Sequence, residues 1–139
     1  MTKRAFSLVE VLVALSVFTM GLLSFLEINS RSQQLSALTI TRTRAALLAQ
    51  EGVEMAESLG YDSLPVGNYL QENSLSAYGS EFVPFSRVVT VQYVDGSLNI
   101  VQADLGMKLV TSTVTWTTEA HDVTKLPKTF TIKTIRTNL

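Results

Sequence analysis

The pattern of hydrophobic residues divides the chain into a long apolar first part and an alternating last part. Residues 6–26 form an almost continuous apolar run with one acid, Glu10, near its start, and no charged residue occurs between Val11 and Leu26. A helix over these 21 residues would be about 31 Å long, which matches the hydrocarbon core of a bilayer. The pattern predicts a membrane-spanning helix that contains one carboxylate.

After this run the apolar residues become one-sided. They recur at spacings of three and four, which is typical of an amphipathic helix; the stripe consists of Leu35, Leu38, Ala45, Leu48, Ala49, Gly52, Met55, Ala56 and Leu59. No proline occurs before Pro65, so one helix is expected from about residue 6 to 59. Its polar face carries Arg42, Arg44, Glu51, Glu54 and Glu57. These charges form either a solvated face or a surface where a shifted neighbour sets basic against acidic residues.

The last part of the chain predicts strands. Residues 61–81 lack periodicity and read as a connection with a short helical turn near residues 70–75. Alternating patterns then predict strands over residues 87–94, 98–103, 107–117 and 129–137, with a turn at Asp95-Gly96. Val110, Val114 and Trp116 share one face. The sequence therefore predicts an α+β fold in which the long helix packs against a small antiparallel sheet of three or four strands.

Composition narrows the classes of function. The 11 basic and 12 acidic residues give a net charge of −1, so no nucleic-acid partner is expected. The chain has no cysteine, which excludes disulfides and thiolate metal sites. Residues 61–139 are few for an independent core, so the β-rich part is expected to use the helix as part of its core.

No set of residues indicates catalysis. The only histidine, His121, lies in a polar segment and is interpreted as a surface residue. Glu51, Glu54 and Glu57 are not accompanied by a histidine or aspartate that would complete a metal site, and no phosphate loop or nucleophile motif occurs. We expect no enzyme, no cofactor and no metal.

Two ordinary interpretations of the first 26 residues compete. A secretory signal peptide would have a shorter apolar core and a small-residue cleavage site, which does not follow here before Glu27. A plain single-pass anchor explains the length and the preceding basic residues Lys3 and Arg4, which place the amino terminus in the cytoplasm. It leaves Glu10 unexplained, because an acid within a membrane costs about 2.5–3.5 kcal/mol.

A third interpretation rests on a resemblance. The residues AFSLVEVLVAL resemble the prepilin signature of type IV pilins and type II secretion pseudopilins. The resemblance implies that prepilin peptidase removes a basic leader, residues 1–5 with Lys3 and Arg4, by cutting between Ala5 and Phe6, and that the same enzyme N-methylates Phe6. It also makes Glu10 a subunit assembly contact. The chain departs from the family pattern in having Ala5 where glycine is usual.

The resemblance extends to the organisation of the chain. It implies that residues 6–28 form the transmembrane and filament-core half of a helical spine, residues 29–60 its amphipathic half, and residues 61–139 a β-rich globular head. The segment TSTVTWTTEAHDVTKLPKTFTIKTI also resembles the terminal hairpin of minor pilins and related pseudopilins. Residues 11–26 and 48–54 look more like minor pilins that initiate or cap filaments than like the abundant subunit. The expected function is that of a minor pilin that initiates or caps a filament. The alternatives are a secretion pseudopilin and a single-pass anchored extracytoplasmic binding module.

The implied partners and location follow from this family. They are prepilin peptidase, other pilin or pseudopilin subunits, the inner-membrane assembly platform, and membrane lipid before assembly. The protein would be a single-pass precursor of the cytoplasmic membrane with its amino terminus inside, and afterwards part of an extracytoplasmic filament.

Overall fold

The structure is a computed structural model that describes residues 7–117 and 126–138. Its contacts divide the chain into two units, Met1–Ile40 and Thr41–Leu139. From here on we call the whole second unit the head, which adds residues 41–60, with the second part of the long helix, to the predicted head of residues 61–139. The leader residues and His121 lie outside the described residues.

Helix α1 covers Leu8–Glu57, against the expected range of about 6–59. Ser7 precedes it, and the Ser7 carbonyl accepts the backbone N–H groups of Glu10 and Val11 at 2.9 and 3.2 Å. At the other end, Ser58 N–H still donates to the Glu54 carbonyl, after which the chain turns. The predicted single helix is therefore confirmed within the described residues.

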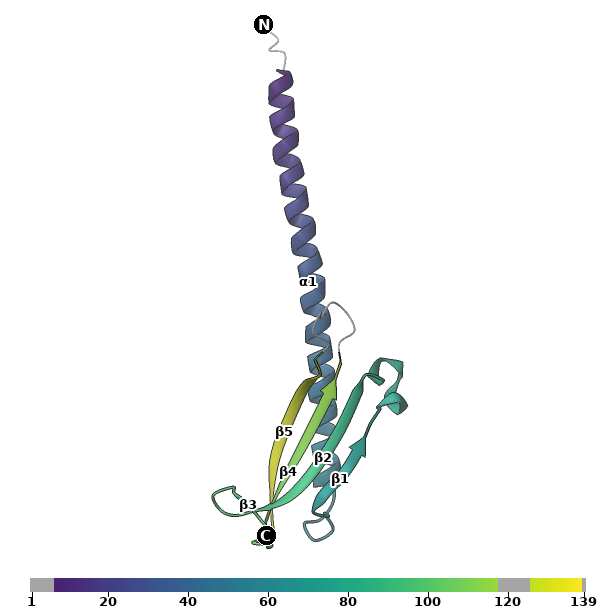
Figure 1. The fold of residues 1–139 in the computed structure, drawn as a ribbon, viewed down its shortest axis with the longest axis vertical. Coiled ribbons are helices and arrows are strands. Elements are labelled where there is room, and N and C mark those ends of the chain that lie inside the picture. Colours follow the sequence, from purple (N-terminus) through teal and green to yellow (C-terminus); the bar gives the residue numbers. More distant parts are fainter. Residues whose placement is uncertain (1–6, 118–125, 139) are drawn as a thin grey trace. The chain divides into compact units, whose positions relative to one another are not determined.

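The head contains an antiparallel sheet in the order β1-β2-β4-β5 (Figure 1). The strands are β1 (Gly67–Glu72), β2 (Phe85–Val94), β3 (Ile100–Val101), β4 (Met107–Trp116) and β5 (Lys128–Thr137). The short strand β3 pairs with the end of β2, where Tyr93 opposes Val101 on one side and Lys108 on the other. Two short 3₁₀ turns, η1 (Ser76–Tyr78) and η2 (Ser80–Phe82), join β1 to β2.

The α+β class is confirmed, but the sheet has five strands and not three or four. The additional strand is β1, which lies in the segment expected to be a connection, and no helical turn forms at residues 70–75. The sequence of β1, GNYLQE, does not alternate between apolar and polar residues, and the pairing register with β2 shifts between Asn68 and Leu70. Pairing with β2, which the local sequence does not reveal, makes it a strand.

The core lies between the second half of α1 and one face of the sheet. The buried stripe of the helix is Ala45, Leu48, Ala49, Gly52, Val53 and Ala56. The facing sheet residues include the expected Val110, Val114 and Trp116, together with Phe85, Val89 and Val91 from β2. The predicted apolar stripe is buried only from Ala45 onward, since Leu35 and Leu38 remain exposed.

Candidate functional site

Of the predicted site residues near the amino terminus, the structure describes only Glu10. Lys3, Arg4, Ala5 and Phe6 lie outside the described residues, so cleavage and methylation at Phe6 stay predictions. Glu10 is described and lies in the first turn of α1. Its side chain is exposed, and no hydrogen bond or ion pair joins it to another residue of the described ranges.

The position of Glu10 has a local electrostatic reason. The first turn of a helix carries partial positive charge from its unpaired N–H groups, so a carboxylate is favoured there. This helix-end effect is worth at most about 1 kcal/mol at an exposed position, less than the cost of placing the acid among lipid chains. A cationic partner would stabilise a carboxylate at this position further.

The surface around Glu10 is apolar on every side of the helix. The large exposed side chains of this part are Leu8, Val9, Val11, Leu12, Val13, Leu15, Val17, Phe18, Met20, Leu22, Leu23, Phe25, Leu26 and Ile28. By its length and composition α1 can cross a membrane. A helix that is apolar all round needs lipid or other helices to cover it.

Three hydroxyl groups in this run donate hydrogen bonds within the helix. Ser16 donates to the Leu12 carbonyl at 2.8 Å, Thr19 to Leu15 at 2.9 Å and Ser24 to Met20 at 2.9 Å. Each of these three hydroxyls would therefore keep a hydrogen-bond partner in a surrounding without water. Glu10 is the polar group of this segment that most needs an external partner.

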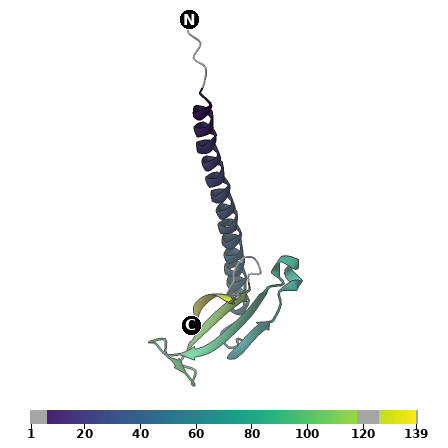
Figure 2. The same cartoon turned by 45° about the horizontal axis from the view of Figure 1, so that its top comes forward.

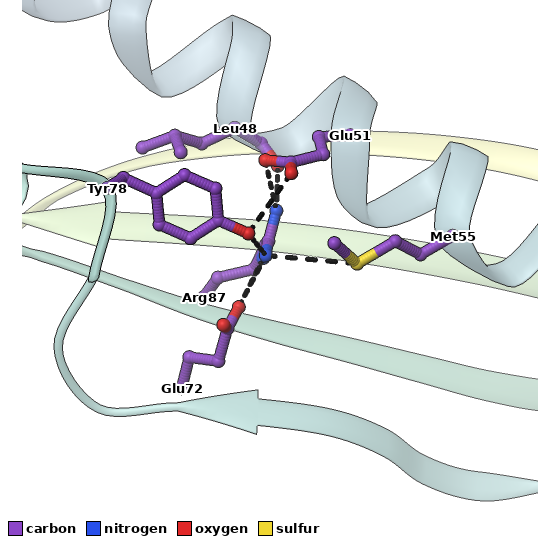
Figure 3. A network of polar contacts seen from close by, with 6 residues as sticks. All are labelled: Leu48, Glu51, Met55, Glu72, Tyr78 and Arg87. Atoms are coloured by element: carbon purple, nitrogen blue, oxygen red, sulfur yellow. Dashed lines mark hydrogen bonds and ion pairs between the residues drawn. The ribbon is translucent and has the colours of Figure 1, made fainter. Parts of the chain in front are cut away.

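A network of polar contacts in the head surrounds Arg87 of β2 (Figure 3). Its side chain is fully buried. The guanidinium donates to the Glu72 carboxylate at 2.7 Å, to the Glu51 carboxylate at 3.0 Å and to the Leu48 carbonyl at 2.9 Å. Tyr78 accepts from Arg87 at 3.1 Å and donates to Glu51 at 3.0 Å.

These contacts fix the charge of Arg87. Burial lowers the pKa of Arg87, but the hydrogen bonds to Glu72 and Tyr78 and the charge of Glu72 outweigh burial, so the pKa is raised. Glu72 lies on β1, Glu51 on α1 and Tyr78 on η1. The guanidinium therefore joins the helix, the edge strand β1 and the connection to β2. Glu51, which the sequence placed on a polar face, thus accepts hydrogen bonds from Arg87 and Tyr78 of the same chain.

Lys108 of β4 is a second buried cation, with 3% of its surface exposed. Its ammonium donates to the carbonyls of Tyr61 and Leu64 at 2.7 and 2.9 Å and lies 4.3 Å from the ring centre of Tyr61. The Tyr61 hydroxyl donates to Asp104. Burial and this bond raise the pKa of Tyr61, while the same bond and the Gly106 N–H lower the pKa of Asp104. The contacts of Lys108, Tyr61 and Asp104 hold the loop after α1 against the sheet.

Sequence reasoning missed both buried cations. Arg87 and Lys108 stand at inward positions of strands whose neighbours on that face are Val89, Val91 and Val110. The signal that could have indicated them is a basic residue at a strand position whose neighbours two residues away are buried and apolar. The carboxylates and carbonyls that accept from them come from distant segments, which the pattern of one strand does not indicate.

The contacts of Arg87 and Lys108 join elements of the head to one another. Within residues 7–117 and 126–138 no cluster of three potential metal-binding side chains occurs. A shallow hollow of about 230 Å³ lies beside Val66, Tyr93 and Ile100, without a charged side chain in its lining. The apolar helix surface with Glu10 and the surface of the head are the candidate functional surfaces.

Comparison with known proteins concerns the amino end alone. Residues 1–26 match the family model of the prokaryotic N-terminal methylation motif, the signature of type IV pilins. The match covers the predicted leader, Phe6, Glu10 and the apolar run. No curated protein and no solved structure matches the chain.

Proposed function

We propose that this chain, which carries the type IV pilin signature, is a structural subunit of a type IV pilus-like filament. The observation that carries the proposal is the coincidence of the motif at residues 1–26 with an exposed apolar helix that has one acid in its first turn. The signature and this helix suit a membrane-anchored precursor. The proposed orientation puts the amino terminus in the cytoplasm, because Lys3 and Arg4 precede the apolar run.

Processing would prepare the assembly contact. Prepilin peptidase would cut between Ala5 and Phe6, remove Lys3 and Arg4, and methylate the new amino group of Phe6. The cationic amine of a neighbouring, axially shifted subunit would then pair with Glu10. A carboxylate among apolar helices is costly alone and tolerable against an ammonium group, so this pair would favour the correct register.

The same apolar surface would serve in two surroundings. Before assembly, lipid would cover the exposed residues of α1. After assembly, the helices of other pilin subunits would cover them. The inner-membrane assembly platform would move the subunit from the lipid into the filament. The subunit would thereby leave the membrane for an extracytoplasmic filament. Its contribution would be structural, as in the type IV pilin family, and it needs no cofactor.

Within this family we propose a minor pilin that initiates or caps the filament. The support is the likeness of residues 11–26 and 48–54 to minor pilins. The carboxyl-terminal Thr-rich hairpin is similar to minor pilins and to related pseudopilins alike, so it does not separate the two. A type II secretion pseudopilin is the second candidate, since it would carry the same signature. A single-pass anchored binding module would use the head without assembly.

Mass spectrometry of the mature amino terminus tests the proposal. Cells that contain the peptidase should yield a chain that begins with N-methylated Phe6, and cells without it should yield the precursor with residues 1–5. A chain that keeps its leader in the presence of an active peptidase would favour the plain anchor. Cleavage after Leu26 would favour a secretory signal. Copy number per purified filament then separates a minor subunit from an abundant one.

A further inference from the structure

The face of the sheet that points away from α1 carries mostly hydroxyl groups. Strands β2, β4 and β5 lie side by side (Figure 2), and they pair without a register shift. Residues opposite one another in such a ladder share a face. Three neighbouring rows across these strands are Ser86–Thr115–Thr129, Val88–Thr113–Thr131 and Thr90–Thr111–Lys133. We call these nine positions the hydroxyl face, since seven of the nine side chains are serine or threonine.

Most of these hydroxyl groups are not used inside the molecule. Thr113 and Thr131 share one hydrogen bond of 3.2 Å, and the Ser86 hydroxyl donates to the Thr115 carbonyl at 3.4 Å. The other hydroxyls form no hydrogen bond within residues 7–117 and 126–138; they belong to Thr90, Thr111, Thr115 and Thr129. None of the nine side chains is buried. The hydroxyl face therefore keeps donors and acceptors for another molecule.

The hydroxyl face is almost without charge. Lys133 is its single charged side chain, and it contains no acid and no aromatic residue, whereas roughly a quarter to a third of an ordinary protein surface is charged. The preference of threonine for strands explains each threonine singly, but not the lack of charge across three strands. Depletion of charge marks the centre of binding surfaces, and protein interfaces add aromatic residues and arginine. The composition thus favours a neutral, hydroxylated partner over a protein or a nucleic acid.

The hydroxyl face is also ordered before any partner arrives. Threonine is branched at Cβ and has few accessible χ1 rotamers, and the sheet places its rows about 6.8 Å apart along a strand and about 4.8 Å apart between strands. Little side-chain freedom is therefore lost on binding. Each neutral hydrogen bond is weak, so appreciable affinity requires many such bonds at once. A polymer with repeating hydroxyl groups meets this requirement, and a single sugar does not.

We infer that the hydroxyl face binds a neutral polysaccharide. Sugar hydroxyls donate to and accept from the threonine hydroxyls in several rows at once, and the threonine methyl groups contact the C–H groups of the sugar rings. Because these contacts involve no ion pair, added salt has little effect on them. This binding goes beyond the proposed filament role and does not depend on it.

Sedimentation with insoluble neutral polysaccharides tests this inference. The full-length chain in detergent is mixed with microcrystalline cellulose, chitin or starch granules, and the bound fraction is measured after centrifugation. The test variant combines Thr111→Val, Thr113→Val and Thr131→Val, because valine keeps the branched shape and the strand preference but removes the hydroxyl. The natural chain should bind at least one of the three polysaccharides, and the test variant should bind it several-fold less.

A control variant removes three exposed hydroxyls outside the hydroxyl face by Ser76→Ala, Ser80→Ala and Thr137→Val. It should bind as the natural chain does. Thermal unfolding followed by Trp116 fluorescence checks that both variants are folded. Binding to none of the three polysaccharides overturns the inference, and so does equal binding by the folded test variant and the natural chain.

Two further measurements examine the kind of contact. Binding should persist in high salt, and its loss there would overturn a neutral contact in favour of one through Lys133. The free monosaccharide at the same mass concentration should displace little of the bound chain, and full displacement would overturn a contact made over several rows. The experiment uses separate subunits, so its failure leaves the proposed filament function standing.

Discussion

Gly52 of α1 lies directly against Ser112 of β4. A Cβ atom on Gly52 would lie 2.6 Å from the Ser112 hydroxyl oxygen and 3.0 Å from a Val89 methyl group. The helix backbone comes close to the sheet at this contact, and the small residues Ala45, Ala49 and Ala56 line the same stripe. Ser112 is fully buried, and its hydroxyl has no hydrogen-bond partner among the described residues.

This relationship predicts opposite effects of two alanine substitutions. Gly52→Ala should destabilise the head by about 1–3 kcal/mol, because the new methyl group overpacks the contact. Ser112→Ala should leave stability unchanged or raise it by up to about 1 kcal/mol, because it removes an unpaired polar atom from the core. Unfolding in detergent can be followed by the fluorescence of Trp116, the single tryptophan.

The double variant tests whether the two residues share one contact. The penalty of Gly52→Ala should be smaller in the Ser112→Ala background, although the close Val89 methyl group keeps part of it. Strictly additive effects would contradict a direct contact between residues 52 and 112.

Removing the buried guanidinium should weaken the connection between α1 and β1. Arg87→Met should lower the free energy of unfolding by about 2–4 kcal/mol, less than for a fully buried pair because Glu51 and Glu72 keep some contact with water. Arg31→Met is the control: its ion pair with Glu27 at 2.7 Å is exposed and should contribute about 0.5 kcal/mol or less. Equal effects of the two changes would show that the Arg87 contacts do not stabilise the head.

The hydrogen-bonded Asp104 predicts acid sensitivity of the head. Hydrogen bonds from Tyr61 and Gly106 lower the pKa of Asp104 in the folded state. Because folding favours the ionised form, this stabilisation is present above the ordinary aspartate pKa of about 4 and is lost as the pH falls below it.

The melting temperature between about pH 5 and pH 2 measures this loss. Asp104→Asn should flatten the decline, since the amide cannot titrate, and Asp62→Asn, a nearby exposed carboxylate, serves as control. An Asp104→Asn profile as steep as that of the natural chain would mean that other groups cause the decline.

Glu10 is the residue that separates anchoring from assembly. Glu10→Ala should insert into the membrane as well as the natural chain, because it removes a charge from the apolar run. It should nevertheless fail to enter filaments, since the Phe6 amine of the neighbour would lose its partner. Membrane fractionation and the subunit content of sheared filaments measure the two steps.

Glu27→Ala is the matched control for that experiment, because it removes an exposed acid further along the same helix. It should change neither insertion nor incorporation. Normal incorporation of Glu10→Ala would refute the proposed pair and leave the acid with its helix-end role alone.

The sequence by itself determined the features that depend on local pattern. The apolar run with its single acid, the uninterrupted helix, and the alternating strands β2, β4 and β5 are each encoded within 10 to 50 consecutive residues. Periodicity reports which face of an element is apolar, and it correctly placed Val110, Val114 and Trp116 in the core. The signature of residues 1–26 is local in the same sense.

Only the tertiary structure decided what depends on distant partners. Strand β1 exists because β2 offers it a pairing edge, and its bulge hides any alternation. Arg87 and Lys108 are buried because Glu51, Glu72 and the carbonyls of residues 48, 61 and 64 reach them from other elements. A buried cation is stable only where such acceptors meet, and which acceptors meet is a property of the assembled fold.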